Sequence, residues 1–293
     1  MAGPPEQPGR TGPCAGSPTI RRREFGSLIR GLRVQRGWTM EYVAELLLCS
    51  PSKVSRLESG QRGASARDVR DLCNIYEVSD EQRARLADLA SAGKQRAWWQ
   101  PLGLPYSTYV GLEAEASSIR DYGLGIIPGL LQTADYARAV VEAAVPRWVP
   151  EVVEQRVQGR MARQQILEPP RRLYFDAVMD ESVLHRVVGG PQTMAAQLAR
   201  LLEVAELPEV SIRVIPYDAG ALPAGNNKFI LLSFAASAVP DVVFIEGLTG
   251  DLYLEDVSDV EVYNATFRAL SELALSPEQT RGRITSVLTS YRR

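Results

Sequence analysis

The chain of 293 residues is poor in the residues that build disulfides, metal sites and nucleophilic active sites. Its three cysteines, Cys14, Cys49 and Cys73, are an odd number at wide spacing and form no CxxC pair, so neither a disulfide framework nor a zinc site is predicted. His185 is the single histidine, and no serine or cysteine stands in a nucleophile motif. We therefore expect no catalytic residues, no metal and no cofactor, and we do not expect an enzyme.

Long apolar runs are lacking as well. The N-terminus has no apolar signal-peptide core, and no later stretch reaches the roughly 18 uninterrupted apolar residues that a membrane span requires. The sequence thus predicts a cytoplasmic protein without a membrane partner. Residues 1–20 are rich in Pro, Gly and Ser and cannot bury enough apolar surface to offset ordering entropy, so we expect a disordered tail there.

The formal net charge of −2 hides an asymmetry between the two parts of the chain. Residues 1–99 carry 16 Lys+Arg against 11 Asp+Glu, a net of +5, whereas the remaining residues carry 17 against 24, a net of −7. Phosphate contacts are therefore expected from the first part. Only three of the 33 basic residues are lysines, which is typical of a GC-rich coding sequence and hints at an actinobacterial host.

Apolar spacing predicts an all-α domain of five short helices over residues 21–92. Phe25, Leu28, Ile29 and Leu32 fall at i, i+3, i+4 and i+7, one apolar stripe of a first helix that Gly37 ends.

Capping residues divide the rest of this domain into four more helices. Thr39 is a natural N-cap for the second, and Ser50 for a third that has Pro51 at its first position and ends at Gly60. A fourth helix has Val69, Leu72, Cys73 and Tyr76 on one face, and a fifth runs from about Ser79 with Leu86 and Leu89 inward.

After a linker over 93–105, the sequence predicts a larger domain over 106–293 of mixed α+β or α/β class. Its short β-branched or aromatic segments, bounded by turn residues, are expected to be strands: 172–179, 210–215, 228–234 and 242–246. Helices are expected over 133–145, 150–167, 191–206 and 256–274. The fold class is therefore multi-domain, an all-α domain followed by a mixed one.

The segment 39–60 (TMEYVAELLLCSPSKVSRLESG) has the spacing of a helix-turn-helix, with residues 51–58 as its recognition helix. Val54 and Leu57 face inward, which leaves Ser52, Lys53 and Arg56 on the outer face near the positive helix N-terminus. Long donors at 53 and 56 can reach guanine in the major groove. The full set of predicted DNA-binding residues is Thr39, Ser50, Pro51, Ser52, Lys53, Ser55, Arg56 and Arg62, with Thr39, Ser55 and Arg62 assigned to phosphate.

The run Ser50-Pro-Ser-Lys-Val-Ser-Arg-Leu-Glu-Ser-Gly60 resembles the recognition-helix segment of Xre-type, Cro/CI-like regulators. Two positions depart from the common pattern. Met40 stands where a glutamine that supports DNA contact is frequent, and Leu48 stands where the turn usually has glycine. Leu48 implies a turn that either avoids a positive φ or tolerates its cost.

Three further segments resemble one actinobacterial family, the WhiJ-like or antitoxin-like regulators: residues 127–138 (IPGLLQTADYAR), 188–191 (VGGP) and 246–255 (EGLTGDLYLE). Members join an Xre-type domain to a C-terminal domain of poorly defined role. The resemblance implies a DNA-binding regulator that often acts with a small protein encoded by an adjacent gene.

Three hypotheses follow for the whole chain. The first is a homodimeric transcriptional regulator that binds double-stranded DNA and whose C-terminal domain senses a ligand or a small partner protein. The second is an antitoxin-like interaction protein that sequesters the product of a neighbouring gene and autoregulates. The third is a small-molecule receptor, or a cryptic enzyme, in residues 106–290, where a pocket could lie between sheet and helices.

Overall fold

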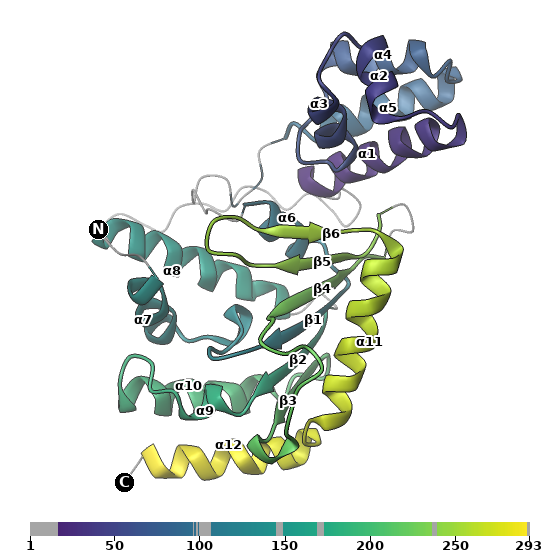
Figure 1. Ribbon diagram of the computed structural model, residues 1–293. Helices are drawn as coiled ribbons and strands as arrows, with labels where there is room; N and C mark the ends of the chain where they lie inside the picture. Colours follow the sequence, from purple (N-terminus) through teal and green to yellow (C-terminus); the bar gives the residue numbers. More distant parts are fainter. Residues whose placement is uncertain are drawn as a thin grey trace, which may run out of the picture. The chain divides into compact units, whose positions relative to one another are not determined.

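The computed structural model describes residues 17–95, 97, 99, 107–144, 149–168, 173–235 and 239–291. The chain divides into two compact units, Met1–Ala97 and Trp98–Arg293, and the division falls inside the interval predicted as a linker. Each unit has a hydrophobic core of its own. The first is helical and the second has a mixed sheet with helices, which confirms the predicted fold class (Figure 1).

The N-terminal unit contains the five predicted helices. They are α1 (Pro18–Gln35), α2 (Met40–Leu46), α3 (Pro51–Glu58), α4 (Ala66–Ile75) and α5 (Asp80–Ala92). Their apolar stripes meet in one core, in which Phe25, Ile29 and Leu72 are each at most 2% exposed. Ser65 and Ser79 begin α4 and α5 with capping boxes, in which side chain and backbone at the helix start satisfy each other's hydrogen bonds.

The start of α1 corrects the predicted tail. Ser17 caps the helix by accepting a hydrogen bond from the Ile20 backbone N–H at 3.4 Å, and Pro18 occupies the first turn. Residues 17–20 are buried, so the prediction of a disordered tail is wrong for these four. A Ser-Pro pair is a favourable helix start, which a reading by composition overlooks. The rest of the predicted tail, residues 1–16, lies outside the described residues.

The C-terminal unit is built on a six-stranded sheet with the order β3-β2-β1-β4-β5-β6. The strands are β1 (Ser118–Gly123), β2 (Tyr174–Asp180), β3 (Val210–Ile215), β4 (Phe229–Ser233), β5 (Val242–Ile245) and β6 (Leu252–Leu254). Strands β1, β2 and β3 are parallel, whereas β4 pairs antiparallel with β1 and continues into the antiparallel β5 and β6. Strand β1 therefore lies where the parallel half meets the antiparallel half.

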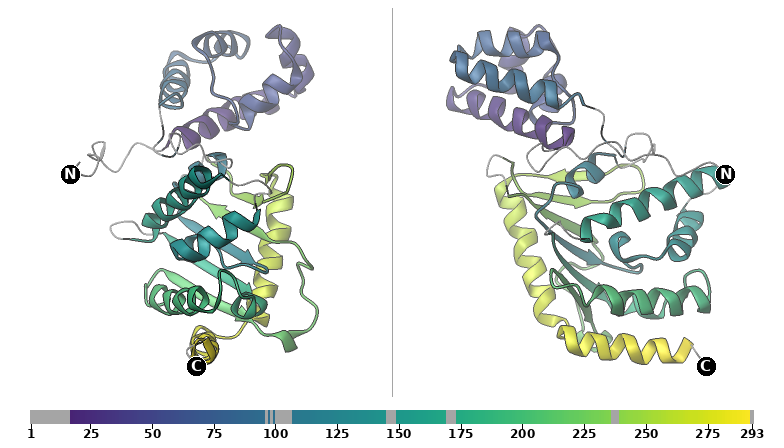
Figure 2. Two further views of the ribbon diagram at one scale, coloured as in Figure 1. Left: turned by 90° about the vertical axis from the view of Figure 1, so that its left-hand side faces the viewer. Right: turned by 180° about the vertical axis from the view of Figure 1, so that it is seen from behind.

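Helices cover both faces of this sheet (Figure 2). They are α6 (Ser107–Glu113), α7 (Ala134–Ala144), α8 (Pro150–Gln164), α9 (Ser182–His185), α10 (Pro191–Val204), α11 (Val257–Leu273) and α12 (Pro277–Tyr291), with short 3-10 turns η2 (Gly129–Leu131), η3 (Gln165–Leu167) and η4 (Tyr217–Ala219). Helix α11 packs on one face through Phe267 and Leu270, against Tyr122 of β1 and Phe229 of β4. Helices α7, α8 and α10 lie on the opposite face (Figure 1).

All four predicted strands are present with ends shifted by at most two residues, and the four predicted helices are present as α7, α8 with η3, α10 and α11. No sequence prediction was made for strands β1 and β6 or for helices α6, α9 and α12. Strand β6 has only three residues. Strand β1 (SIRDYG) was missed because Arg120 and Asp121 interrupt the apolar pattern that a strand with two covered faces normally shows.

Candidate nucleic-acid interface

Side-chain caps define where the two helices of the helix-turn-helix begin. Thr39 Oγ1 accepts a hydrogen bond from the Tyr42 N–H at 3.2 Å and starts α2. Ser50 Oγ accepts one from the Lys53 N–H at 3.3 Å and starts α3, where Pro51 holds the first position. Proline fits there because the first helical N–H has no partner within the helix. Both caps lie where the sequence predicted them.

The turn between α2 and α3 is a Schellman motif with leucine in the position that normally carries glycine. The Leu48 N–H donates to the Glu45 carbonyl at 3.0 Å, and the Cys49 N–H donates to the Ala44 carbonyl at 2.9 Å. Leu48 has a φ of 51° and is 91% exposed. Of the two possibilities left open by the sequence, the turn therefore tolerates a positive φ.

The inner face of α3 is held tightly against α1. Val54 and Leu57 are each 1% exposed within the core. At Gly26 of α1, a Cβ atom would lie 2.2 Å from the Glu58 carbonyl oxygen, so the two backbones can approach only because this residue is glycine. The end of α3 is thus fixed by backbone contact as well as by apolar packing.

An ion pair between the half-buried Arg33 and the buried Glu58 also fixes α3. Arg33 of α1 donates from Nε and Nη2 to the two carboxylate oxygens of Glu58 at 2.7 and 2.8 Å, and from Nη1 to the Trp38 carbonyl at 2.9 Å. The hydrogen bond to Glu58 raises the pKa of Arg33 above its ordinary value. Sequence spacing gives no sign of this pair, because 25 residues separate Arg33 from Glu58.

The outer face of α3 presents Ser52, Ser55 and Arg56, all of which are exposed. Arg56 Nε donates to the Ser52 carbonyl at 3.1 Å, and within the described part of the chain its guanidinium has no carboxylate partner. Arg62 is exposed in the loop after α3, where its backbone N–H donates to the Arg56 carbonyl at 3.0 Å. These exposed polar residues run along α3 and into the loop that follows it.

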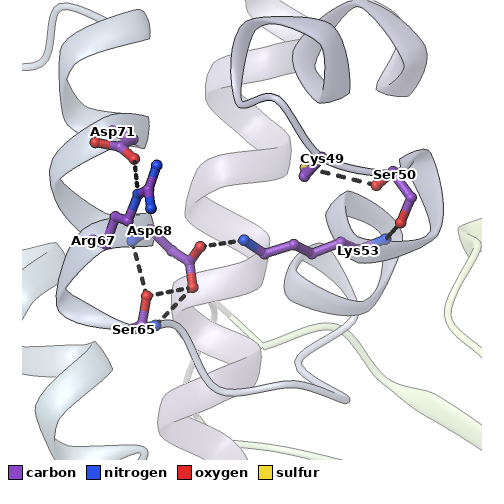
Figure 3. A network of polar contacts seen from close by, with 7 residues as sticks. All are labelled: Cys49, Ser50, Lys53, Ser65, Arg67, Asp68 and Asp71. Atoms are coloured by element: carbon purple, nitrogen blue, oxygen red, sulfur yellow. Dashed lines mark hydrogen bonds and ion pairs between the residues drawn. The ribbon is translucent and has the colours of Figure 1, made fainter.

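Lys53 of α3 has a carboxylate partner instead. Its Nζ is 2.5 Å from Asp68 Oδ1, and Asp68 Oδ2 accepts from the Ser65 N–H and hydroxyl at 2.9 and 2.7 Å (Figure 3). Burial of Asp68 opposes its ionisation, but the hydrogen bonds from Lys53 and Ser65 outweigh this effect and keep its pKa below the usual range. Only 25% of the Lys53 side chain is exposed, so it joins α3 to the start of α4.

Comparison with known proteins agrees with this architecture. A family model described as a helix-turn-helix domain matches residues 24–86, which supports a DNA-binding regulator in general. A second model, described as a domain of unknown function, matches residues 106–286, more than half of the chain. Neither the curated proteins nor the solved structures contain a match.

Two further observations concern other kinds of site. None of the helices in the described ranges is long and apolar enough to cross a membrane. Nor do three or more His, Cys, Asp or Glu side chains gather in a possible metal site anywhere among residues the structure describes.

Proposed function

Because the chain belongs to the DUF5753 family and carries a helix-turn-helix domain ahead of that family's domain, we propose that it is a sequence-specific transcriptional regulator whose helix α3 enters the major groove of double-stranded DNA. One observation carries this proposal: the outer face of α3 holds an exposed arginine, Arg56, that has no carboxylate partner among the residues described, and the inner face of the same helix is fixed by core packing. A preorganised donor of this kind is what base readout requires.

The contacts of each side chain suggest its role at the DNA. Arg56 is the residue best placed to donate to guanine O6 and N7, with Ser52 beside it on the same exposed face. Ser55, Thr39 and Arg62 are assigned to phosphate, which fixes the register without reading the sequence. Lys53 is assigned a positioning role, because its ammonium already binds Asp68.

Ser50 and Pro51 contribute chiefly by starting α3 at a defined residue. The helix N-terminus is then directed outward with its positive dipole end available to a phosphate.

The proposal includes a homodimer that reads an inverted repeat. Helix α3 has eight residues and is therefore only about 12 Å long, which covers a few base pairs. Two such helices about 34 Å apart would enter successive major grooves and double the readout. Sedimentation analysis of the full chain, free and bound to its site, tests this point, and a monomer in both states would contradict it.

The finer resemblance to Xre-type and WhiJ-like regulators belongs to this proposal too. Our proposal assigns the C-terminal domain the binding of a ligand or a small partner protein, and no catalysis. In the alternative hypothesis, the C-terminal domain binds a small protein encoded by an adjacent gene, as in antitoxin-like regulators. Co-purification of such a protein with the full chain from its host would favour that alternative.

Genomic footprinting of the tagged protein tests the function directly. We expect discrete palindromic peaks that disappear in a Ser52→Ala/Arg56→Ala variant. Arg85→Ala is the matched control, because it removes a positive charge from α5 and leaves α3 intact. Background signal for the unaltered protein, or equal peaks in the double variant, would contradict the assignment of α3.

Binding measurements on single variants separate base contacts from phosphate contacts. Arg56→Ala is expected to weaken binding to the preferred site by about 1–3 kcal/mol and to relax base preference. Arg62→Ala is expected to weaken binding to all sequences similarly and to reduce the salt dependence. If Arg56→Ala lowered affinity equally for every sequence, Arg56 would not be a base-reading residue.

A further inference from the structure

The C-terminal unit has a partly open cavity of about 200 Å³ between its sheet and helices α7 and α8. Its floor comes from three adjacent strands, because Asp121 of β1 pairs in register with Ile230 of β4, and Ile230 pairs with Phe244 of β5. Loop residues after β1 and the sides of α7 and α8 complete the wall. Strand β1 lies between β2 and β4, where the strand order of the sheet changes direction. Sheets of this kind commonly bind ligands at the point where the strand order reverses.

Asp121 is an acidic residue at a buried strand position, where an apolar residue would normally pack. It lies on the central strand and is 4% exposed, with Ala177 and Ile230 as its cross-strand neighbours. Its Oδ1 has no hydrogen-bond partner among the described residues. Burial raises the pKa of Asp121 to about 6. A buried carboxylate oxygen without a hydrogen-bond partner costs folding free energy, unless a bound molecule supplies the missing donor.

Three arginines of α8 line the opposite side of the cavity. Arg156, Arg160 and Arg163 are spaced by four and three residues, which places them on one helix face. Arg163 is neutralised, because it donates to both carboxylate oxygens of Glu113 at 2.6 and 2.7 Å. Glu113 also accepts from the Tyr109 hydroxyl at 2.7 Å.

The other two arginines lack a matching negative charge within the described ranges. Arg160 Nη1 donates to the neutral amide of Gln132 at 2.7 Å, and its buried Nε has no hydrogen-bond partner there. Arg156 likewise has no carboxylate within ion-pair distance in that part of the chain. The cavity therefore offers two uncompensated positive charges and, across from them, one buried carboxylate.

The remaining charged pair at this cavity compensates itself, and the rest of the lining is largely apolar. Lys228 Nζ lies 3.3 Å from Glu246 Oε2. Ile127, Leu130 and Val141 add to the apolar surface. The volume is smaller than the roughly 300–1,000 Å³ of a pocket for a drug-sized molecule, so the occupant must be small.

We propose that this cavity binds a free amino acid with an apolar side chain, its carboxylate on Arg156 and Arg160 and its ammonium on Asp121. Each uncompensated group of the cavity then has a partner of opposite charge, and the apolar lining covers the side chain. Charge-assisted hydrogen bonds of this kind are the stronger ones in proteins. The inference concerns the C-terminal unit alone and does not depend on DNA binding by α3.

Isothermal titration calorimetry of the full chain with each standard L-amino acid at millimolar concentration tests the proposal. At least one apolar amino acid is expected to bind with one site per chain. Its N-acetyl derivative, which lacks the ammonium, and the corresponding amine, which lacks the carboxylate, are each expected to bind about tenfold or more weakly. If no amino acid binds, or if both derivatives bind as well as the parent, the proposal is overturned.

Variants locate the site. Asp121→Asn and Arg160→Gln are expected to lower affinity for that amino acid about tenfold or more. The controls Asp135→Asn, at an exposed residue, and Arg200→Gln, at a half-exposed residue outside the cavity, are expected to leave it unchanged. Asp121→Asn is also expected to abolish the discrimination against the N-acetyl derivative, which a merely structural effect would not do. Binding that persists unchanged in both cavity variants overturns the proposal. Circular dichroism verifies that each variant is folded.

Discussion

Replacing Asp121 with Asn is predicted to stabilise the C-terminal unit at neutral pH. Burial raises the pKa of this carboxyl from 3.8 to about 6, with Glu113 and Glu246 adding to the effect and Lys228 and Arg163 opposing it. The folded chain therefore keeps the proton over a pH interval in which the unfolded chain has lost it. The stability contributed by this group is present below pH 3.8 and is lost as the pH rises to about 6.

The magnitude follows from the size of the pKa shift. One pKa unit corresponds to about 1.4 kcal/mol, so a rise of this size costs the folded state about 3 kcal/mol at neutral pH. Asn is close to Asp in shape and carries no charge to desolvate. The variant's gain in unfolding free energy, relative to the unaltered chain, is therefore expected to grow by about 2 kcal/mol between about pH 4 and about pH 7, since the unfolded carboxyl is already partly ionised at pH 4.

Urea unfolding of the full chain measures this difference in unfolding free energy. Hydrogen exchange of the β1 backbone amides assigns the difference to the C-terminal unit, to which β1 belongs. Taking the difference between two chains at each pH cancels the other titrating groups, which both chains share. Asp135→Asn is the control, since this carboxylate is exposed, and no pH-dependent difference is expected from it. A difference that stays constant with pH, or that grows as the pH falls, would refute the reasoning about Asp121.

Three other changes each test the packing inside one of the two units. Leu48→Gly relieves a positive φ at a residue without core contacts and is expected to stabilise the helical unit by about 0.5–1 kcal/mol in thermal unfolding; a loss of stability would show that the turn is not strained. Gly26→Ala is expected to cost more than about 2 kcal/mol because its Cβ would overlap the backbone of α3, whereas the control Gly31→Ala, with nothing within 4 Å, should stabilise α1; similar effects of both would contradict the close crossing. Glu113→Gln should cost about 3–5 kcal/mol in urea unfolding, because it removes the carboxylate charge that compensates the buried guanidinium of Arg163, and adding Arg163→Met should recover much of that loss.

The helix-turn-helix could be predicted from sequence because its signals are local. A cap such as Ser50 bonds to a backbone N–H three residues away, and the residue that begins α3 follows from that contact alone. The apolar spacing of Val54 and Leu57 likewise defines which face of α3 is buried. The exposed position of Arg56 follows from the same helix geometry.

The partner of Lys53 could not be predicted in this way. Asp68 is 15 residues away and belongs to the capping box of the next helix. Which charged side chains meet depends on how α3 and α4 pack, and a periodic pattern contains no information on that packing. Helix periodicity alone therefore grouped Lys53 with Arg56 on the outer face, although in the structure Lys53 binds Asp68.

Strand β1 illustrates the same limit in the larger domain. Arg120 and Asp121 hide the strand in the sequence, yet β1 lies at the centre of the sheet and carries the buried carboxylate of the cavity. A local pattern tends to fail where a protein keeps a polar group in its interior, and such positions are often functional.

The sequence by itself determined the two-unit architecture, the five N-terminal helices and most elements of the sheet domain, because backbone hydrogen bonding and apolar periodicity act over a few residues. Only the tertiary structure decided the strand order, the partners of Lys53 and Arg33, and the cavity that joins β1, β4, β5 and α8. Those features depend on contacts between residues far apart in the chain, whose energies arise only once the elements have packed.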